Sequence, residues 1–264
     1  MGTISKALEM LNCFSRKRPE IGLSEFVRLT GRDKATVHRH LVELEQNGFL
    51  EQHPVTRAYR LGPAILRLTG VREATNPVRS ILRPVVTGLA QETGELAHAS
   101  LLQGQMLSPV FHFDPQMHGI KVNFDEAELL PLHATSSGLA VLAFAEERLR
   151  KEVLAANLDA FTPNTIVDPE KLTPLIASAR RTGLSHLDRT YDEEVTSQGA
   201  PVFGAAGEVI GALSVAVPSV RAQPDRLSEI SVALATAARS ATRSLGGTYP
   251  DLPLPGQTDP SRFS

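Results

Sequence analysis

Apolar residues with helical spacing predict two short helices within residues 23–62. In the first, Ser24 can accept an orphan backbone N–H group as the N-cap, and Gly31 ends the helix. Its expected core side chains are Phe26, Val27 and Leu29. In the second helix Asp33 is the N-cap, and one apolar stripe recurs at i, i+4 and i+7, formed by Val37, Leu41 and Leu44.

Two short strands should follow the second helix. Residues 49–52 and 58–61 read as a hairpin, and the loop between them carries Arg57. Helix, glycine turn, capped helix and basic hairpin in this order predict a winged helix-turn-helix. The alternative is an exposed amphipathic helix in an ordinary three-helix domain.

The second helix of the motif has a predictable outer face. At 100° per residue, the positions that point away from the apolar stripe would face a DNA major groove, and the hairpin tip would touch the phosphate backbone or the minor groove. The residues expected to contact DNA are Lys34, Ala35, Thr36, His38, Arg39 and Arg57.

A helical connection and a second domain are expected beyond residue 62. Residues 63–94 predict two linker helices interrupted at Asn76-Pro77, and their apolar stripe favours dimerisation. Residues 95–246 alternate strands and helices, which predicts a mixed, mostly antiparallel sheet covered by helices. The expected strands cover residues 96–103, 106–113, 120–124, 184–187, 198–203 and 209–217. The expected helices cover residues 135–156, with a break near Ala145, 169–181 and 227–245. Residues 247–264 have little to bury and are expected to form a disordered tail.

Length and charge fit an α+β protein with two domains that works as an oligomer. The chain has 264 residues and 42% hydrophobic content, enough for two cores. Residues 1–62 hold ten Lys/Arg against seven Asp/Glu, whereas the remainder holds seventeen against twenty-two. Because so small a surplus binds phosphates weakly, we expect two or more DNA-binding domains per assembly, on a palindromic site. The lone Cys13 and the lack of a signal or membrane-spanning segment favour a cytoplasmic protein without membrane contact.

Several ordered sequence blocks resemble the IclR family of bacterial transcription regulators. Besides the winged helix-turn-helix, they are YRLG at residues 59–62, LPLHATSSGLAVLAF at 130–144, TPNTIVDPEKL at 162–172, GAPVF at 199–203 and GALSVAVP at 211–218. The resemblance implies an N-terminal winged helix-turn-helix, a C-terminal GAF/PAS-like effector-binding domain, dimers that pair into tetramers, and small organic acids as common effectors.

The start of the helix near residue 135 offers a setting for a carboxylate. Hydroxyl side chains and unpaired backbone N–H groups converge there, at the positive end of the helix dipole. Plain N-capping by Thr135 or Ser136 is the alternative explanation, and the resemblance to the IclR family, which places this segment at the effector pocket, shifts the balance toward a ligand. The expected effector-binding residues are Thr135, Ser136, Ser137, Gly138, Asp188, Ser197 and Ser214.

Several of these positions depart from the family pattern. Where the family often has a cysteine this chain has Ser197, where it often has a second serine this chain has Ala216, and one of its two acidic positions is lost beside Asp188. A leucine and a lysine of the family helix are replaced by Ser137 and Leu139. We therefore expect an acidic ligand with a larger or more apolar body, and no other cofactor.

Three other functions compete with this interpretation. A metal site would draw on His98, His112, His118 and His133, although their spacing matches no compact metal motif. Hydrolase activity would rest only on His133 preceding two serines, without a nucleophile-elbow pattern. A module acting through protein partners would be favoured if Arg39→Ala and Arg57→Ala left promoter binding unchanged. We expect a ligand-controlled DNA-binding protein that is not an enzyme, in which the effector shifts the spacing of two recognition helices.

Overall fold

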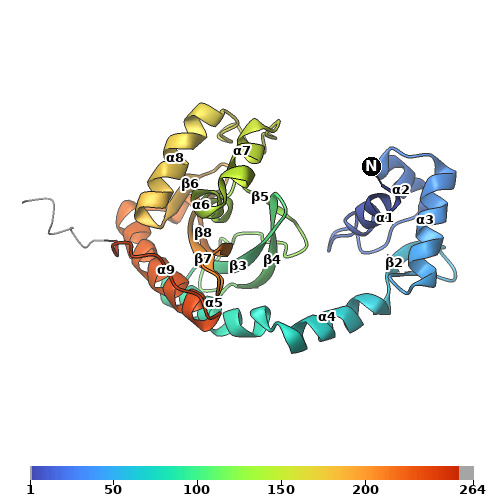
Figure 1. Ribbon diagram of the computed structural model, residues 1–264, viewed down its shortest axis with the longest axis horizontal. Coiled ribbons are helices and arrows are strands. Elements are labelled where there is room, and N and C mark those ends of the chain that lie inside the picture. Colours follow the sequence, from blue (N-terminus) through green and yellow to red (C-terminus); the bar gives the residue numbers. More distant parts are fainter. Residues whose placement is uncertain (1, 256–264) are drawn as a thin grey trace, which may run out of the picture. The chain divides into compact units, whose positions relative to one another are not determined.

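The computed structural model describes residues 2–255, which form two compact units, Met1–Pro77 and Val78–Ser264 (Figure 1). The elements of the first unit are α1 (Thr3–Leu11), α2 (Leu23–Thr30), α3 (Lys34–Gln46), β1 (Leu50–Gln52), β2 (Tyr59–Leu61) and α4 (Pro63–Thr75). This confirms the helix-turn-helix and its hairpin. Helix α2 begins one residue earlier than expected, because Gly22 is its N-cap and Ser24 does not cap it.

The turn between α2 and α3 is set by two residues. Gly31 takes a left-handed conformation (φ 64°), which glycine adopts without a steric penalty, and ends α2. The Asp33 side chain accepts a hydrogen bond from the backbone N–H of Thr36 at 2.9 Å and so caps α3. These two local signals fix where the recognition helix begins.

One small aromatic and aliphatic core holds the first unit together. Phe26 packs edge-on against Phe14 and Tyr59, with ring centroids 5.7 and 6.3 Å apart. Ile21 forms an isolated antiparallel bridge with the hairpin, because it exchanges two backbone hydrogen bonds of 2.9 Å with Tyr59. The wing is thereby tied to the segment that precedes α2.

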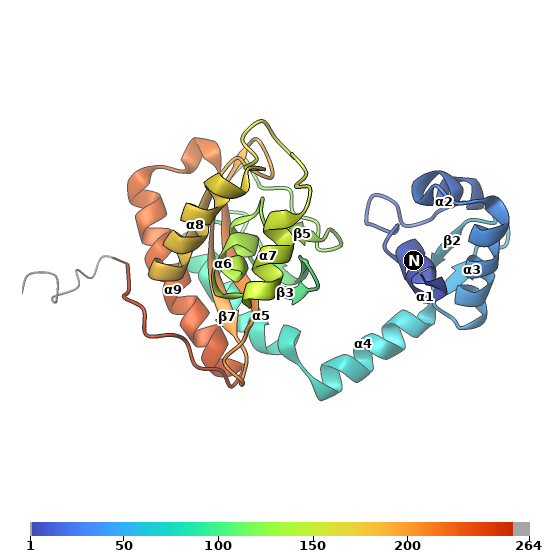
Figure 2. The ribbon, with the colours of Figure 1, turned by 45° about the horizontal axis from the view of Figure 1, so that its top comes forward.

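The second unit is a three-layer α/β/α domain (Figure 2). Its elements are α5 (Val78–Thr93), β3 (Leu96–Gln103), β4 (Met106–Phe113), β5 (Leu130–Pro131), α6 (Ser136–Phe144), α7 (Glu147–Ala155), α8 (Pro169–Thr182), β6 (Ser185–Asp188), β7 (Val195–Phe203), β8 (Val209–Pro218), a single 3-10 turn η1 (Ser219–Arg221) and α9 (Pro224–Ser244). The strand order is β5-β4-β3-β8-β7-β6. Helices α5 and α9 cover one face and α6 packs on the other, with α8 against α6.

Two expectations about the sheet need correction. Every pairing is antiparallel, so the sheet is not mixed. Residues 121–125 form no strand; the outer edge of β4 is paired instead by β5. The apolar Phe124, which suggested a strand, instead stacks on the ring of His98.

The segment joining the units divides between them. Helix α4 belongs to the first unit, whereas α5 packs on α9 and the sheet of the second. Three large apolar side chains of α4 are exposed in the single chain: Leu66, Leu68 and Val71. Within residues 2–255, no helix combines the length and apolar character that a membrane crossing requires.

The first part of the expected tail is packed on the second unit. The ring of Tyr249 lies edge-on against Phe203 at 5.3 Å, and Arg239 lies over the Tyr249 ring and donates a hydrogen bond to the carbonyl oxygen of Leu252. The proline-rich composition did not predict this packing, because the packing depends on one aromatic side chain, that of Tyr249. Residues 256–264 of the expected tail lie outside the described residues.

Candidate functional site

The outer face of α3 presents free polar side chains. Val37, Leu41 and Leu44 are buried, as the apolar stripe predicts. Of the residues expected to contact DNA, Thr36 is half-buried, and the others on this helix are exposed: Lys34, Ala35, His38 and Arg39. The helix therefore has an apolar inner face and a polar, basic outer face.

The wing carries Arg57 at an exposed position with a left-handed backbone (φ 60°). His53 organises the wing, because its Nδ1 accepts hydrogen bonds from the backbone N–H groups of Val55 and Thr56, both at 3.2 Å. A nearby basic residue, Arg60, is neutralised by Glu51 at 2.5 Å. Arg57 is thus the basic side chain that the hairpin tip holds out toward solvent.

One residue of α3 was missed by the sequence analysis. His40 is buried, and no described residue hydrogen-bonds its Nε2 atom. Burial, and then the nearby Arg39, lowers the pKa of His40, so that it packs as a neutral ring. Its position three residues after Val37 and one before Leu41 places it on the inner stripe, a signal obscured by counting histidine as polar.

The second unit contains a cavity of about 80 Å³ at the start of α6. That volume is well above the roughly 10–15 Å³ that one water molecule needs. Helix α6 packs on β7 and β8, and the neighbouring part of the sheet is covered instead by residues 122–124, so the cavity lies between the helix start and this loop. The residues that line it are His98, Val122, Asn123, Phe124, Leu130, Thr135, Ser136, Ser137, Thr190, Tyr191, Asp192, Val195, Ser197, Ser214 and Ala216.

The start of α6 is fixed tightly on the sheet. A Cβ atom on Gly199 would lie 2.4 Å from the carbonyl oxygen of Ser136, so glycine permits this close approach. That same carbonyl accepts a hydrogen bond of 2.6 Å from the Ser185 hydroxyl, and the Thr190 hydroxyl donates to the carbonyl of Ala134 at 2.7 Å. The position of the helix start is therefore determined by strands β6 and β7, far away in the sequence.

Most hydroxyl hydrogens at the helix start are already used within the protein. Thr135 donates to the carbonyl of Pro131 at 2.8 Å and accepts from the backbone N–H of Gly138 at 3.1 Å. Ser214 donates to the carbonyl of Gln198 at 2.8 Å, so Ser136 is the donor in the 3.0 Å contact between the two serine hydroxyls. What remains for a ligand are the backbone N–H groups of Ser136 and Ser137, which have no intrahelical acceptor.

Five of the seven expected effector-binding residues line the cavity together, and two do not. Ser137 and Ser197 join the three residues just described, and the Ser197 hydroxyl has no hydrogen bond within the described part of the chain. Gly138 is absent from the lining because its N–H group is taken by the N-cap Thr135 and its Cα faces the backbone of Leu132.

Asp188 lies on the opposite face of the sheet from the cavity. Side chains alternate along a strand, and its neighbour Leu187 packs in the core on the α6 side. The Asp188 carboxylate accepts a hydrogen bond of 2.6 Å from Thr196 and pairs with Arg189, contacts that lower the pKa of Asp188. The sequence analysis placed it near the ligand only through the aligned family position, which says nothing about the face.

The cavity also recruits residues that the sequence analysis did not single out. His98 was a candidate metal ligand, with a pocket-lining or core position as the other explanation, and its ring borders the cavity and stacks on Phe124 with centroids 4.5 Å apart. Burial, and then the neighbouring His112, lowers the pKa of His98 to about 3, so the ring is neutral. Burial, and then Glu128, raises the pKa of Tyr191 to about 12, so the phenol is neutral too.

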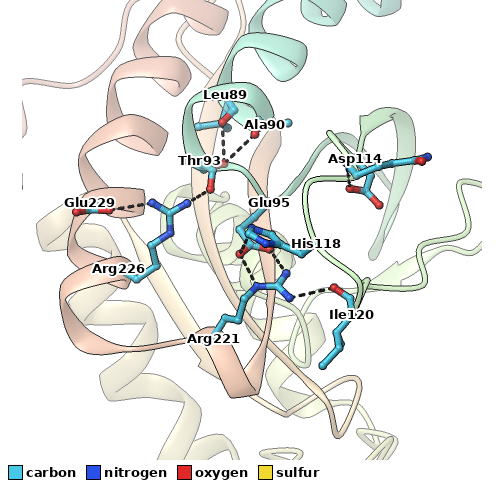
Figure 3. A network of polar contacts seen from close by, with 11 residues as sticks. Leu89, Ala90, Thr93, Glu95, Asp114, His118, Ile120, Arg221, Arg226 and Glu229 are labelled. Carbon is cyan, nitrogen blue, oxygen red and sulfur yellow. Dashed lines mark hydrogen bonds and ion pairs between the residues drawn. The ribbon is translucent and has the colours of Figure 1, made fainter.

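The loop over the cavity is attached at both ends by charged groups, and Figure 3 shows the attachment through Glu95 and Arg221. The buried Glu95 receives two hydrogen bonds from Arg221, at 2.9 and 2.7 Å, and Arg221 also donates to the carbonyl of Ile120 at 3.0 Å. Farther along, Glu126 accepts from both the backbone N–H and the Nδ1 of His112, at 3.0 and 2.7 Å. Residues 122–124 lie between these two points of attachment.

The alternatives of a metal site and a hydrolase gain no geometric support. Among residues 2–255, no group of three or more His, Cys, Asp or Glu side chains is placed to hold a metal ion. The Nε2 atom of His133 is 2.9 Å from the carbonyl oxygen of Asp159 and so is oriented toward that loop. This nitrogen is therefore occupied by a backbone contact.

Comparison with protein-family models gives two matches that together span nearly the whole chain. The model described as "Bacterial transcriptional regulator IclR C-terminal" matches residues 74–243, and the "IclR helix-turn-helix domain" matches residues 3–54. Among curated proteins, the chain is 25% identical to the regulator XynR of Escherichia coli, over 94% of this chain and 98% of XynR. It is 28% identical to the regulator KipR of Bacillus subtilis, over 93% of this chain and 98% of KipR.

Solved structures show the same fold. An IclR transcriptional regulator from Silicibacter sp. TM1040 aligns with a TM-score of 0.87 and 45% identity, over 96% of this chain and 100% of the other. An IclR homologue from Microbacterium hydrocarbonoxydans, solved in complex with 4-hydroxybenzoate, aligns with a TM-score of 0.75 and 26% identity, over 92% of this chain and 99% of that one.

Proposed function

The chain belongs to the IclR family of bacterial transcriptional regulators, with an N-terminal helix-turn-helix DNA-binding domain, and from this premise we propose a ligand-controlled switch. In this proposal the protein binds palindromic promoter DNA as a dimer or a dimer of dimers. A small organic acid bound in the second unit changes its affinity for that DNA. The family consists of transcriptional regulators, which fits a role other than enzyme.

The DNA part of the proposal is supported by the exposed face of α3. Arg39 is suited to a guanine edge or a phosphate, and the small Ala35 lets the helix approach a base closely or touch a thymine methyl. Lys34, Thr36 and His38 would add contacts at the helix start and centre. Arg57 would reach the backbone or the minor groove from the wing.

The oligomer is supported by charge and by exposed apolar side chains. One first unit has a surplus of three basic over acidic residues within residues 1–62, which is small for phosphate binding, so two copies on two half-sites are needed for useful affinity. The exposed side chains of Leu66, Leu68 and Val71 on α4 offer a surface that a second copy can cover. Residues 63–94 are therefore the proposed dimerisation segment.

The main support for the proposed organic-acid ligand is the cavity at the start of α6. Among the described residues no lysine or arginine lines it, so an anion would be held by the N–H groups of Ser136 and Ser137 and by the helix dipole. Ser197 would add a hydroxyl donor, whereas the Ser137 hydroxyl already donates to Thr135 at 3.4 Å. Its remaining walls are largely apolar, which suits an acid with an apolar body. The related protein that holds 4-hydroxybenzoate makes aromatic acids the first class to test.

Signal transfer would run through the segment between the units. Helix α5 packs on α9 and on the sheet that carries the cavity, and it follows α4 directly after Asn76-Pro77. A ligand that binds one arrangement of α5 better than another would shift the population of recognition-helix spacings. A spacing that matches half-sites about one helical turn apart would bind the promoter.

Calorimetry with a panel of organic acids that includes 4-hydroxybenzoate tests the ligand class. We expect at least one acid to bind below the millimolar range, and its amide to bind more weakly because the amide lacks the charge that the helix start favours. Tight binding of a neutral compound, with no acid binding below the millimolar range, would sink the acid proposal. Selection from random duplexes tests the DNA part; recovered sites without inverted half-sites would contradict it.

A further inference from the structure

His98 has a hydrogen-bonding nitrogen that the protein does not use. It lies in the middle of β3, where it pairs with Ser214 on β8 and with His112 on β4, and its side chain is 5% exposed. The Nδ1 atom is 3.1 Å from the hydroxyl of Ser100. Within residues 2–255 no hydrogen bond involves Nε2, while the ring borders the cavity.

The contact with Ser100 determines which nitrogen carries the hydrogen. Ser100 is buried, and among the described residues its hydroxyl contacts no acceptor other than Nδ1 of His98. The hydroxyl therefore donates to Nδ1, and a neutral ring bonded in this way keeps its hydrogen on Nε2. His98 thus offers the cavity a neutral N–H donor.

This donor lies to one side of the place where the anionic group is expected. Helix α6 packs on β7 and β8, and its start contacts Gly199 of β7, whereas His98 is on β3, which is next to β8 and two strands from β7. Adjacent strands are separated by roughly 4.8 Å, so a carboxylate at the helix start leaves His98 near the body of the ligand. The stacked ring of Phe124 supplies an apolar surface beside it.

We propose that His98 recognises a second oxygen atom, a hydroxyl or carbonyl oxygen on the body of the ligand. The cavity would then be selective for hydroxy- or oxo-substituted carboxylic acids over the unsubstituted acids. This inference rests on the proposed function, because it assigns the specificity of the same cavity. A buried donor that meets no acceptor loses its hydrogen bonds to water, which is why an unsubstituted ligand is disfavoured.

The test compares 4-hydroxybenzoate with benzoate by calorimetry on the full chain and on His98→Phe. Phenylalanine keeps a ring against Phe124 and removes the N–H group. One hydrogen bond predicts that the native protein prefers the hydroxylated acid by about tenfold, and that His98→Phe loses this preference while its affinity for benzoate changes less than twofold. His186→Phe, which changes an exposed histidine outside the cavity, should keep the preference.

Two results in this comparison would overturn the assignment. A tenfold preference that survives in His98→Phe would show that another residue reads the hydroxyl group. An equal loss of affinity for both acids would show that His98 holds the carboxylate.

A neutral pair of probes, 4-hydroxybenzamide and benzamide, separates this inference from the acid proposal. If the amides bind and the acids do not, the acid class fails, and the ratio between the amides then tests His98. Native protein that binds none of the four compounds overturns both ideas. Nitrogen NMR of the native protein at pH 6 needs no variant: a neutral ring with its hydrogen on Nε2 is expected, and a hydrogen on Nδ1 or a charged ring contradicts the assignment.

Discussion

The outer face of α3 and the wall of the cavity are both polar, but their donors differ in availability. On α3 most of the side chains expected to meet DNA extend from one helix into solvent, and within residues 2–255 the Arg39 guanidinium makes no hydrogen bond or ion pair. In the cavity the hydroxyl groups of Thr135, Ser136 and Ser214 donate to other protein groups. An exposed surface presents its side chains directly, whereas a buried site offers only the donors left over after its own hydrogen bonds are made.

This difference predicts that mutations at the two sites fail in different ways. A substitution on α3 should change DNA affinity with little effect on folding. A substitution near the cavity should alter stability as well as binding, because the same groups hold the domain together. The following tests are ordered from the largest expected effect to the smallest.

Arg39→Ala should weaken binding to a selected palindromic duplex by at least about 30-fold, because losing two contacts removes about 2 kcal/mol or more. Each arginine contact to a guanine edge contributes about 1–3 kcal/mol, and a dimer loses two of them. Fluorescence anisotropy on a labelled duplex measures the change. Arg148→Ala removes an equally exposed arginine from α7 and should leave DNA affinity unchanged; an unchanged affinity in Arg39→Ala instead would remove this residue from the interface.

Gly199→Ala should destabilise the second unit by about 1–3 kcal/mol, the usual effect of overpacking a tight site. Its new Cβ atom would meet the carbonyl of Ser136 at 2.4 Å and push the start of α6 away from the sheet. Urea unfolding followed by circular dichroism gives the free energy. Gly119→Ala, at a glycine of the second unit with open space around it and no left-handed backbone, is the control and should keep the native stability. Native stability in Gly199→Ala would contradict the close contact.

His98 should make the second unit less stable as the pH is lowered. Its pKa is lowered to about 3 in the folded protein, so below about pH 6.5 the unfolded chain binds a proton that the folded chain does not. Stability should therefore fall between pH 7.5 and 5, by about 2 kcal/mol from this residue. In His98→Phe the fall should be shallower, as measured by urea unfolding at each pH. Parallel curves for the two proteins would refute the assignment.

Thr135→Ala should cost the second unit about 1 kcal/mol through loss of the N-cap. The hydroxyl of Thr135 accepts the N–H hydrogen bond of Gly138, and Thr135→Ser keeps that hydroxyl, so the serine variant should retain most of the stability. Thermal unfolding of the three proteins makes the comparison. If the serine variant is as unstable as the alanine variant, the methyl group rather than the cap is responsible.

Asp188→Asn should change acid binding less than twofold. The carboxylate faces away from the cavity and is held by Thr196 and Arg189. Calorimetry with whichever acid binds the native protein measures this. A loss of affinity comparable to that of Ser197→Ala would place Asp188 in the ligand site after all.

The sequence alone determined the features that depend on neighbours within one turn or one strand. The caps at Gly31 and Asp33, the stripe of Val37, Leu41 and Leu44, and the break near Ala145 follow from local spacing, because backbone conformation and amphipathic periodicity are set by residues a few positions apart. The family followed from the same ordered blocks. Local signals also explain the error at residues 120–124, where an apolar run was taken for a strand.

Only the tertiary structure decided the composition of the cavity. Its walls come from β3, the loop before β5, α6, the segment after β6, β7 and β8, so no spacing within one segment could bring His98 to Ser136 or separate Asp188 from Ser197. The face on which each strand residue lies depends on the pairing of strands far apart in the chain. The hydrogen-bond partners that leave the Nε2 of His98 free arise in the same way, which is why the sequence could name this residue only as one of four histidines and not assign it to the ligand.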